Sequence, residues 1–436
     1  MYDCIVIGGG PAGLMAAASA AEHGARVCLL EKGGKLGRKL AISGGGRCNV
    51  TNRQPLPLLV EHLPGNGKFL YSGFSVFNNE SIIAFFEQLG IQLKEEDRGR
   101  MFPVSNSAQD VVQALLRKLS TLHVDMHVNT KVEGLQFAGQ GLEGVIVKGK
   151  GLLKAPTVII ATGGKSVPKT GSTGDGYGWA KAAGHSITEL YPTEVPVTSN
   201  VGWIQSKQLQ GLSLSDVAVT VYSHKNKAIK THRWDALITH FGFSGPAILR
   251  CSQYVVKALK KSKGQGDVSL GFDIFPDSMM EDVFQQICQI QQQAPDKAVK
   301  NAFRGFLPER YLRLLLEHAD IDEDVMARTI PKQKLRVLAG LCKDFRASVN
   351  GTLSIEKAFI TGGGVHLKEV DPKTMQSKKM NGLFFCGEVL DIHGYTGGYN
   401  ITAAFVTGFC AGKGVAEVIQ GAPQMDENSV SLSNKN

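Results

Sequence analysis

The sequence lacks closely spaced cysteines. Its eight cysteines occur singly, and no CxxC motif is present. This absence argues against a zinc site and against a dithiol redox pair. Several of the cysteines lie in apolar stretches, where cysteine behaves as a small hydrophobic residue. Such a pattern is typical of a protein from a reducing compartment, and we expect a cytoplasmic protein with no metal site.

Long hydrophobic runs are also missing. No apolar run reaches the roughly 18 residues that a membrane-spanning helix needs. No basic segment precedes the apolar start of the chain, as it would in a secretory signal. We therefore expect neither a membrane-spanning segment nor a membrane partner.

Aromatic residues are few, at 7%, and they do not accompany the basic residues. The formal net charge is +9, which admits an anionic cofactor, an acidic substrate or RNA. The densest basic groups are Lys225, Lys227, Lys230 and Arg233, and then Lys257, Lys260, Lys261 and Lys263. Neither group is interleaved with the aromatic residues on which single-stranded nucleic acids stack. The sequence thus favours a small-molecule substrate over nucleic acid.

The 436 residues suffice for two or three domains, and the first thirty predict a βαβ unit. Cys4–Ile7 and Arg26–Leu30 are short apolar strands, and Pro11–Glu22 is an alanine-rich helix. A nucleotide-binding domain is predicted from residues 1–190 and 355–421. A strand-rich insertion is predicted at 191–277 and 343–354, with a helical insert at 278–342 and a polar tail at 422–436.

Gly8, Gly10 and Gly13 form a GxGxxG motif between a predicted strand and a predicted helix, which is the context that this motif requires. Its glycines let the backbone approach a pyrophosphate, and the helix N-terminus supplies partial positive charge. Glu31 ends the second strand, where a carboxylate binds the adenosine ribose and would repel an NADP phosphate. Pro11 favours FAD over NAD.

A second glycine-rich segment, Gly37–Asn52, also carries basic and polar residues. Its glycines would let the backbone pass against a flat ring, and Lys39 or Arg47 would compensate the charge of a pyrophosphate or a reduced flavin. Cys48 invites interpretation as a nucleophile. No histidine neighbours it in sequence, so we interpret it as a buried thiol beside the cofactor.

Further glycine-rich turns follow predicted strands near both ends of the chain. Ala161, Thr162 and Gly163 end one strand, and Gly387 and Glu388 follow another. The last predicted helix begins near Gly398, and its N-terminus would stabilise an anionic reduced flavin. No second GxGxxG motif is present, so NADH or NADPH would dock only transiently as an electron donor.

In their order along the chain, these motifs resemble the YhiN-like (BaiN/RdsA-type) family of NAD(P)/FAD-dependent oxidoreductases. The resemblance covers about residues 1 to 415 and is carried by Gly8–Gly13, Ile42–Asn49, Ala161–Gly164, Gly171–Tyr177, Thr239–Pro246, Thr361–Val365, Thr374–Met375 and Gly387–Asn400. It implies an α/β fold with a discontinuous Rossmann-like FAD-binding domain, an inserted β-barrel-like domain and a small helical insert. One departure is Thr402, where members often carry glutamine.

Motifs and resemblance together predict one FAD site from both ends of the chain. Its predicted contacts are Gly8, Gly10, Pro11, Ala12, Gly13, Glu31, Lys32, Lys39, Ser43, Gly44, Gly45, Arg47, Cys48, Asn49, Val132, Ala161, Thr162, Gly163, Gly387, Glu388, Gly398, Tyr399, Asn400 and Ile401.

The leading hypothesis is a flavoenzyme that transfers a hydride at flavin N5 to or from a small organic substrate. Reduction of an activated C=C bond with NAD(P)H is one reaction, and oxidation of an amine or hydroxyl is the alternative. Two further classes are an RNA-modifying or RNA-binding flavoprotein and a redox sensor that holds FAD without turnover. The sequence indicates neither the substrate nor the oligomeric state.

The catalytic candidates are Arg47 and Asn49, with Thr51, over the flavin ring, and His240 from the inserted domain. His240 is equally interpreted as a hydrogen-bonded structural histidine. His393 and Tyr395 are alternatives near the C-terminal flavin loop.

Overall fold

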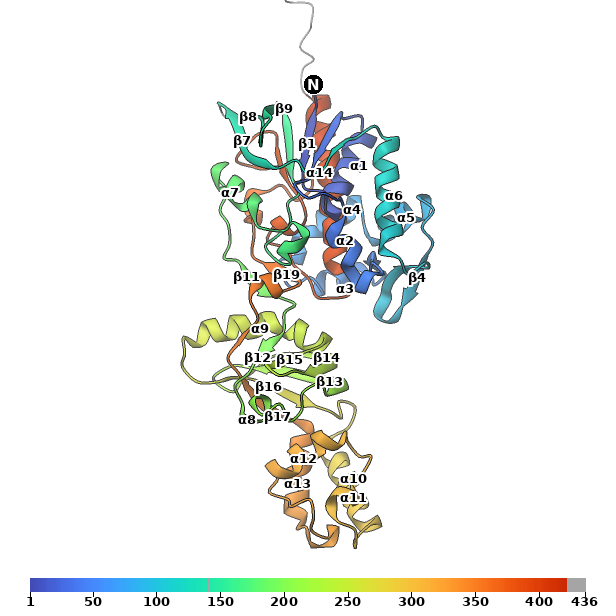
Figure 1. Cartoon of the computed structure of the whole chain (residues 1–436), viewed down its shortest axis with the longest axis vertical. Coiled ribbons are helices and arrows are strands. Elements are labelled where there is room, and N and C mark those ends of the chain that lie inside the picture. Colours follow the sequence, from blue (N-terminus) through green and yellow to red (C-terminus); the bar gives the residue numbers. More distant parts are fainter. Residues whose placement is uncertain (140, 422–436) are drawn as a thin grey trace, which may run out of the picture. The chain divides into compact units, whose positions relative to one another are not determined.

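The structure is a computed structural model that describes residues 1–139 and 141–421, so the predicted polar tail lies outside the described residues. The chain forms two compact units (Figure 1). Unit 1 combines Met1–Leu190 with the chain from Thr361 onward, and unit 2 is Tyr191–Ile360. The N-terminal and C-terminal parts of the chain thus fold together.

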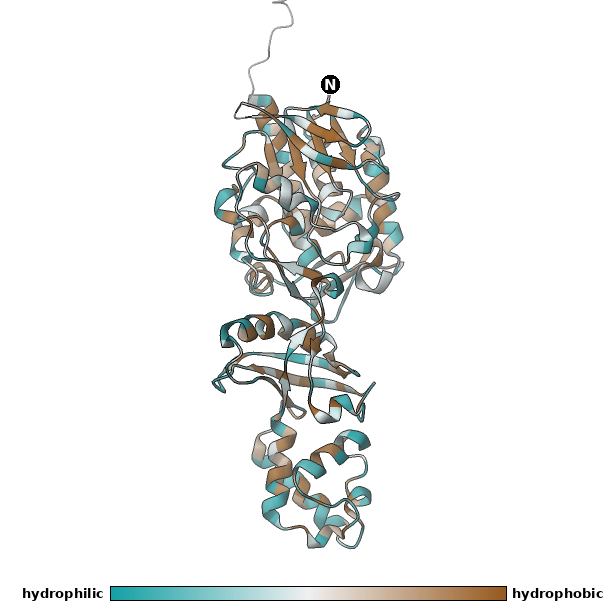
Figure 2. Cartoon of the chain, turned by 60° about the vertical axis from the view of Figure 1, so that its left-hand side comes forward, coloured by the Kyte–Doolittle hydropathy of each residue, from teal (hydrophilic) through white to brown (hydrophobic). Residues whose placement is uncertain are grey.

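A five-stranded parallel sheet forms the centre of unit 1, in the order β20-β10-β1-β2-β6. Its strands are β1 (Cys4–Ile7), β2 (Val27–Leu30), β6 (Asp125–His127), β10 (Thr157–Ile160) and β20 (Leu383–Phe385). All but β6 are buried along their whole length, which explains their almost uninterrupted apolar sequences. Figure 2 shows these strands as a brown, hydrophobic group. The predicted α/β Rossmann-like fold is confirmed.

Helices α1 (Pro11–Glu22) and α14 (Tyr399–Gly421) lie side by side. A Cβ added to Gly408 would lie 2.4 Å from the carbonyl oxygen of Ala12, and one added to Gly412 would lie 2.4 Å from that of Ala16. Larger residues would therefore force the helices apart. By length and composition α14 would be able to span a membrane, but 72% of its apolar window is buried in unit 1. We interpret α14 as a core helix.

The other elements of unit 1 surround this core. They are α2 (Arg38–Ile42), β3 (Thr51–Asn52), α3 (Leu56–Glu61), α4 (Tyr71–Val76), α5 (Asn79–Gln88), β4 (Leu93–Glu96), β5 (Arg100–Pro103), α6 (Ala108–Thr121), β7 (Val132–Ala138), β8 (Gly141–Val147), β9 (Gly151–Lys154) and α7 (Asp175–Ala182). Strands β3-β5-β4 and β7-β8-β9 form two small antiparallel sheets. The side chains of Asn78 and Ser107 cap α5 and α6 by accepting hydrogen bonds from the backbone N–H groups of Ser81 and Asp110.

Unit 2 contains a seven-stranded antiparallel sheet, in the order β17-β16-β13-β14-β15-β12-β18. Its strands are β12 (Val197–Thr198), β13 (Ser213–Tyr222), β14 (Ala228–Ile238), β15 (Gly242–Ser244), β16 (Val268–Asp273), β17 (Phe345–Val349) and β18 (Gly351–Thr352). The two edge strands, β17 and β18, are separated only by Asn350. The sheet must therefore curl so that its edges approach each other.

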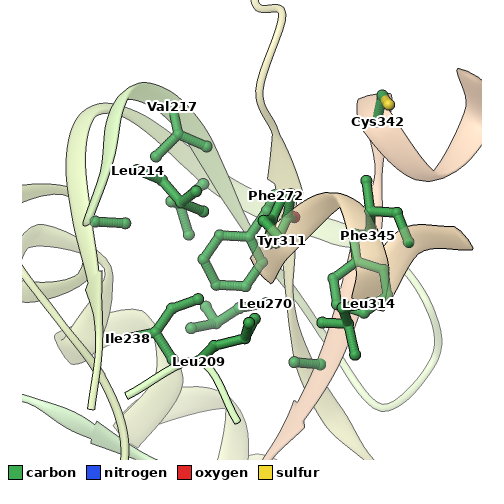
Figure 3. Packing of buried hydrophobic residues seen from close by; sticks show 14 of the residues in the cluster. Leu209, Leu214, Val217, Ile238, Leu270, Phe272, Tyr311, Leu314, Cys342 and Phe345 are labelled. Carbon is green, nitrogen blue, oxygen red and sulfur yellow. The ribbon is translucent and has the colours of Figure 1, made fainter. Parts of the chain in front are cut away.

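The helices of unit 2 share a hydrophobic core with this sheet. They are α8 (Gly202–Gln205), α9 (Pro246–Ser262), α10 (Met280–Gln293), α11 (Val299–Ala302), α12 (Glu309–His318) and α13 (Lys332–Lys343). Figure 3 shows Tyr311 of α12 beside Phe272 and Phe345 of the sheet. The Tyr311 and Phe345 rings are arranged edge to face, with their centroids 6.0 Å apart. The hydrophobic core of the sheet thus continues into the helices of residues 278–342, which also pack against one another.

The chain leaves unit 1 and returns to it at neighbouring points. The backbone N–H of Thr188 donates to the carbonyl of Gly364 at 2.8 Å, and the N–H of Gly364 donates to the Thr188 hydroxyl at 2.9 Å. Within unit 2, the N–H of Phe359 donates to the carbonyl of Glu194 at 3.1 Å. Unit 2 is thus an insertion whose two ends are close together in space.

Candidate functional site

The glycine turn between β1 and α1 contains three glycines with different environments. Gly8 has φ +110°, and an added Cβ would lie 2.5 Å from the Ala161 carbonyl oxygen. A Cβ on Gly13 would lie 1.9 Å from the Gly8 carbonyl oxygen, whereas one on Gly10 meets no described atom within 4 Å. Gly8 and Gly13 are therefore required by the fold. Gly10 leaves space at the N-terminus of α1, as a bound phosphate needs.

The N-terminus of α1 carries uncompensated partial positive charge. Pro11 occupies its first turn together with Ala12, no side chain caps it, and the turn has no acidic residue. The peptide dipoles of the helix favour an anion at this position.

Glu31 at the end of β2 holds the glycine turn. One carboxylate oxygen accepts from the backbone N–H of Gly9 at 2.8 Å, and the other accepts from that of Gly33 at 2.7 Å. The adjacent Lys32 forms an ion pair with Asp175 at 2.6 Å and donates to the Thr173 hydroxyl. Of the two residues predicted here, Glu31 thus lies beside the glycine turn, and Lys32 lies beside the start of α7.

Lys39 and Glu388 form an ion pair at 2.6 Å across 349 positions of sequence. The Glu388 side chain is 16% exposed, and its carboxylate also accepts from the Ser166 hydroxyl at 2.9 Å and the Thr361 N–H at 2.8 Å. Burial alone would raise the pKa of Glu388, but the Lys39 ammonium and these hydrogen bonds outweigh it and hold the pKa below its ordinary value. The carboxylate is therefore ionised and fixes four chain segments.

The segment Ser43–Gly46 forms a short 3-10 turn in which Gly44 and Gly45 have φ of 56° and 69°. Added Cβ atoms on Gly45 and Gly46 meet no described atom within 4 Å. Cys48, two residues after this turn, is fully buried, and burial raises the pKa of its thiol to about 12. A protonated, buried thiol fits the interpretation of Cys48 as a structural thiol beside the cofactor. It does not fit a nucleophile, which reacts as the thiolate.

Arg47 and Asn49, the two catalytic candidates of this loop, have different environments. Arg47 donates to Glu96 at 2.8 Å, and its guanidinium lies over the Phe102 ring at 4.1 Å. Its charge is therefore balanced within the loop region. Asn49 is 7% exposed, and its Oδ1 atom has no hydrogen-bond partner among the described residues. A Cβ on Gly398 would lie 2.9 Å from this oxygen, so Asn49 is adjacent to the start of α14.

The turn after β10 contains a second buried oxygen without a partner. In the described part of the chain, Thr162 Oγ1 accepts and donates no hydrogen bond. Gly176 of α7 packs against it, because an added Cβ would approach it to 2.3 Å. On either side, Ala161 is buried and Gly163 has φ +73°. Buried polar atoms are rarely left without partners, so Asn49 and Thr162 indicate a ligand in this site, and the residues present fit FAD.

The C-terminal segment forms the other side of the site. A Cβ on Gly387 would lie 2.7 Å from the Ala12 Cβ, and one on Gly398 would lie 2.7 Å from the Thr51 carbonyl oxygen. Tyr399 is buried and donates its hydroxyl proton to Gln54 at 2.9 Å. The structure therefore brings residues from the two ends of the chain into contact.

Asn400 is engaged with its own loop. Its carbonyl oxygen accepts from the Gly394 N–H at 2.7 Å, and its amide donates to the Gly394 and Tyr395 carbonyls. The next residue, Ile401, is half-buried. At the position that departs from the family pattern, Thr402 is fully buried, and its hydroxyl lies 2.7 Å from that of Thr51. A threonine there joins α14 to β3.

Three further predicted residues have no described contact with the cofactor-loop residues above that identifies a role for them. Val132 is buried at the start of β7, where it pairs with Val147 of β8. His240 belongs to unit 2, is exposed in the turn between β14 and β15, and meets the Phe241 ring edge to face. His393 is 1% exposed and its ring packs against Gly65. Their roles stay predictions.

Sequence reasoning missed Ser166 and the role of Thr361 as a hydrogen-bond donor to Glu388. Thr361 begins the Thr361–Val365 motif, so a signal existed, whereas nothing in the local sequence singles out Ser166. No group of three His, Cys, Asp or Glu residues able to hold a metal occurs among the residues that the structure describes.

Comparison with known proteins gives full-length matches. The protein family described as HI0933-like protein Rossmann domain matches residues 2–414. The ribosomal RNA dihydrouridine synthases of Haemophilus influenzae and Escherichia coli are 30% and 32% identical to the chain, each over 93% of it and over 97% and 95% of their own lengths. The 3-dehydro-bile acid delta(4,6)-reductase of Clostridium scindens is 28% identical over 94% of this chain and 98% of its own.

Solved structures agree on the fold. A flavocytochrome c3 fumarate reductase in its open conformation is similar with a TM-score of 0.50 and 19% identity, over 95% of this chain and 78% of its own. At this identity the similarity concerns the fold alone.

Proposed function

Because the chain belongs to the HI0933-like family of FAD-dependent oxidoreductases, we propose that it reduces the C5–C6 double bond of a uridine in ribosomal RNA. The observation that carries this proposal is the full-length similarity to two ribosomal RNA dihydrouridine synthases. Dihydrouridine is uridine with that bond saturated, so their names describe a two-electron reduction of a C=C bond conjugated to a carbonyl. The net charge of +9 supports an anionic substrate.

FAD held in the candidate site, once reduced by two electrons, would supply the hydride for one carbon of the double bond, and a proton would add to the other. NADH or NADPH is the proposed electron donor, oxidised to NAD(P)⁺ as its hydride is transferred. It docks transiently, since the sequence has one GxGxxG motif, at Gly8–Gly13.

The residues of the chain bind and orient the cofactor. The N-terminus of α1, next to Gly10, receives the pyrophosphate, and Glu31 receives the adenosine ribose. The buried oxygens of Asn49 and Thr162 are the proposed acceptors for donor groups of FAD. Lys39 remains paired with Glu388 and keeps the loop before Cys48 in place.

A direct experiment follows hydrogen uptake by RNA. The purified holoprotein is incubated with NADH or NADPH and an unmodified ribosomal RNA transcript, and the digested nucleosides are analysed by mass spectrometry. We expect one or a few uridines to gain two hydrogen atoms, and none to do so without the donor. Reduction of the bound flavin by NAD(P)H with no change in any uridine would refute the proposed substrate.

The second candidate substrate is a steroid with a conjugated enone. It is favoured by the similarity to the bile acid reductase, which covers 94% of this chain. Hydride addition to the β-carbon of an enone is the same type of reaction as the reduction of uridine, but the substrate ring carries no phosphate charge. A 3-oxo-4,6-diene bile acid offered to the reduced protein distinguishes the two, because only the true substrate reoxidises the flavin in the absence of oxygen.

A further inference from the structure

Unit 2 brings together the two lysine groups that are separate in sequence. Residues 223–227 form the turn between β13 and β14, and the turn after α9 contains Gly266. A Cβ on Gly266 would lie 3.4 Å from the His224 Cβ, so the two turns are in contact. Strand pairing fixes this arrangement, since Tyr222 of β13 is opposite Ser269 of β16. We define the lysine patch as Lys225 and Lys227 of the first turn and Lys263 of the second, with Lys230 near the start of β14 and Lys261 at the end of α9.

The five lysines of the patch form no ion pair with the described residues. In the described part of unit 2, no acidic oxygen lies within 4.0 Å of any of its five ammonium groups. Other cations of this unit are paired: Arg233 with Asp216 at 2.7 Å, and Lys343 with Asp273 at 2.7 Å. At this end of the sheet Asp344 pairs with Arg346 at 2.8 Å. Asp267, next to Gly266, accepts a hydrogen bond from the neutral Ser348 hydroxyl at 3.2 Å, which does not neutralise its charge, so one carboxylate stands beside five lysines.

The lysine patch is also accessible and built on a fixed base. Four of its members are exposed, and Lys230 is half-buried. Beside it, the Arg346 guanidinium lies over the Tyr222 ring at 3.7 Å and donates to Asn226 of the same turn. Lysines at the end of α9 are stabilised by the helix dipole, which accounts for Lys261 without a ligand. The dipole does not account for Lys225 and Lys227, which lie on a strand turn.

We propose that the lysine patch of unit 2 binds the phosphate backbone of the RNA substrate. This inference rests on the proposed function and assigns the substrate-holding surface to the inserted unit. Several unpaired ammonium groups repel one another, and a chain of phosphates relieves this repulsion while releasing its own counterions. Lysine contacts of this kind position RNA without reading its sequence.

The test compares two triple variants of the full-length holoprotein. The patch variant carries Lys225→Gln, Lys227→Gln and Lys261→Gln. The control carries Lys297→Gln, Lys332→Gln and Lys357→Gln, which removes the same charge from exposed lysines of unit 2 that also lack ion pairs. Binding of an unmodified ribosomal RNA transcript is measured over a series of salt concentrations.

We expect the patch variant to bind the transcript about tenfold more weakly or worse at low salt. The slope of log affinity against log salt should fall by about one for each phosphate that is no longer neutralised by a lysine. The control should bind within about twofold of the wild type. Equal binding by the patch variant and the control, or no binding of RNA by the wild type at low salt, would overturn the proposal.

Two further measurements separate this inference from the proposed function. The rate of flavin reduction by NAD(P)H should be the same in both variants and the wild type, which shows that the FAD unit is intact. If the wild type binds RNA through the patch but reduces no uridine, the proposed function is wrong and the assignment of the patch as an RNA-binding surface is kept. If the wild type reduces uridine but the patch variant binds RNA like the control, only the assignment of the patch is wrong.

Discussion

Glu388 illustrates how a charged residue is kept ionised in the candidate site. Its carboxylate pairs with Lys39 and accepts hydrogen bonds from Ser166 and Thr361, which outweigh the cost of its burial. Removing one partner of such a group leaves the other without compensation. The pair therefore matters for the fold of the site as well as for its charge.

We expect Glu388→Gln to lower the free energy of unfolding by about 1–3 kcal/mol at pH 7, because the Lys39 ammonium loses its counter-charge. A carboxyl with a lowered folded-state pKa stabilises the fold above its ordinary value of 4.5, and this contribution is lost as the pH falls below that value. Urea unfolding of the variant should thus depend less on pH in this acidic range. Glu87→Gln, an exposed and unpaired site, is the control, and a wild-type pH dependence in Glu388→Gln would contradict the assignment.

The cysteines give a second prediction at this scale. All eight are buried, and burial raises the pKa of the Cys4, Cys28 and Cys48 thiols to about 12. We expect native protein to react with iodoacetamide at pH 8 at least about 100-fold more slowly than guanidinium-unfolded protein, by mass spectrometry. Cys48→Ala should reduce its flavin with NAD(P)H within about twofold of the wild-type rate. Rapid labelling of Cys48 in the native protein would restore its interpretation as a nucleophile.

Arg47 shows where residue-level inference from sequence ends. Its place in a glycine-rich loop predicted a position over the flavin ring. In the structure it pairs with Glu96 of β4 and stacks on Phe102 of β5, and its position over the ring stays a prediction. The charged sequence of β4 gives no apolar alternation, so this hairpin was not predicted and neither was its effect on Arg47. The local motif identified Asn49, but its contact with Gly398 at the start of α14 joins distant parts of the chain and has no local signal.

At the scale of elements, the sequence predicted helices and strands correctly where a proline or an apolar run marks their boundaries. Helix α1 spans Pro11–Glu22 and strand β1 spans Cys4–Ile7, both as predicted. The contact of α1 with α14 depends on small residues, Gly408 and Gly412, that have no local pattern. Close packing of distant elements therefore required the structure.

The glycine turn that begins α1 offers a matched pair of substitutions. Gly13→Ala places a methyl group 1.9 Å from the Gly8 carbonyl oxygen, and we expect it to destabilise the FAD-free protein by about 1–3 kcal/mol. Gly10→Ala meets no described atom within 4 Å, so its FAD-free stability should change by less than about 0.5 kcal/mol. Its methyl group occupies the space of the pyrophosphate, and its Kd for FAD should rise about tenfold or more.

Urea unfolding of the FAD-free proteins and titration with FAD measure both effects of this pair. The prediction depends on the contrast, because a general defect would lower stability and affinity together. Unchanged FAD affinity in Gly10→Ala would show that the pyrophosphate does not lie at the N-terminus of α1.

At the scale of the whole molecule, the predicted FAD contacts all lie in unit 1, and His240 and the lysine patch lie in unit 2. The sequence favoured a small organic substrate because its two lysine groups are far apart and lack interleaved aromatic residues. Their meeting depends on the pairing of β13 with β16 and could not be predicted locally. This meeting, together with the similarity to two ribosomal RNA dihydrouridine synthases, is why we propose RNA as the substrate.

Replacing residues 191–360 by a short glycine-serine linker should leave the cofactor site intact. Thr188 and Gly364 are hydrogen-bonded neighbours, so a short connection closes the gap without strain. We expect this variant to bind FAD with a Kd within about tenfold of the wild-type value and to lose binding of ribosomal RNA. Calorimetric titration and filter binding measure the two quantities. A folded variant that retains wild-type RNA affinity would place the RNA surface on unit 1.

The parallel sheet of unit 1 has a consequence for the synthesis of the protein on the ribosome. Strand β1 emerges first, but β20 and α14, which complete its sheet and cover α1, are made last. At about 5–20 residues per second, the first strand waits on the order of 20–80 s for β20. Throughout that interval β10 lacks its neighbour β20, and the apolar face of α1 lacks α14, which packs along it. Nascent chains of this protein are therefore expected to need chaperone protection until translation is almost complete.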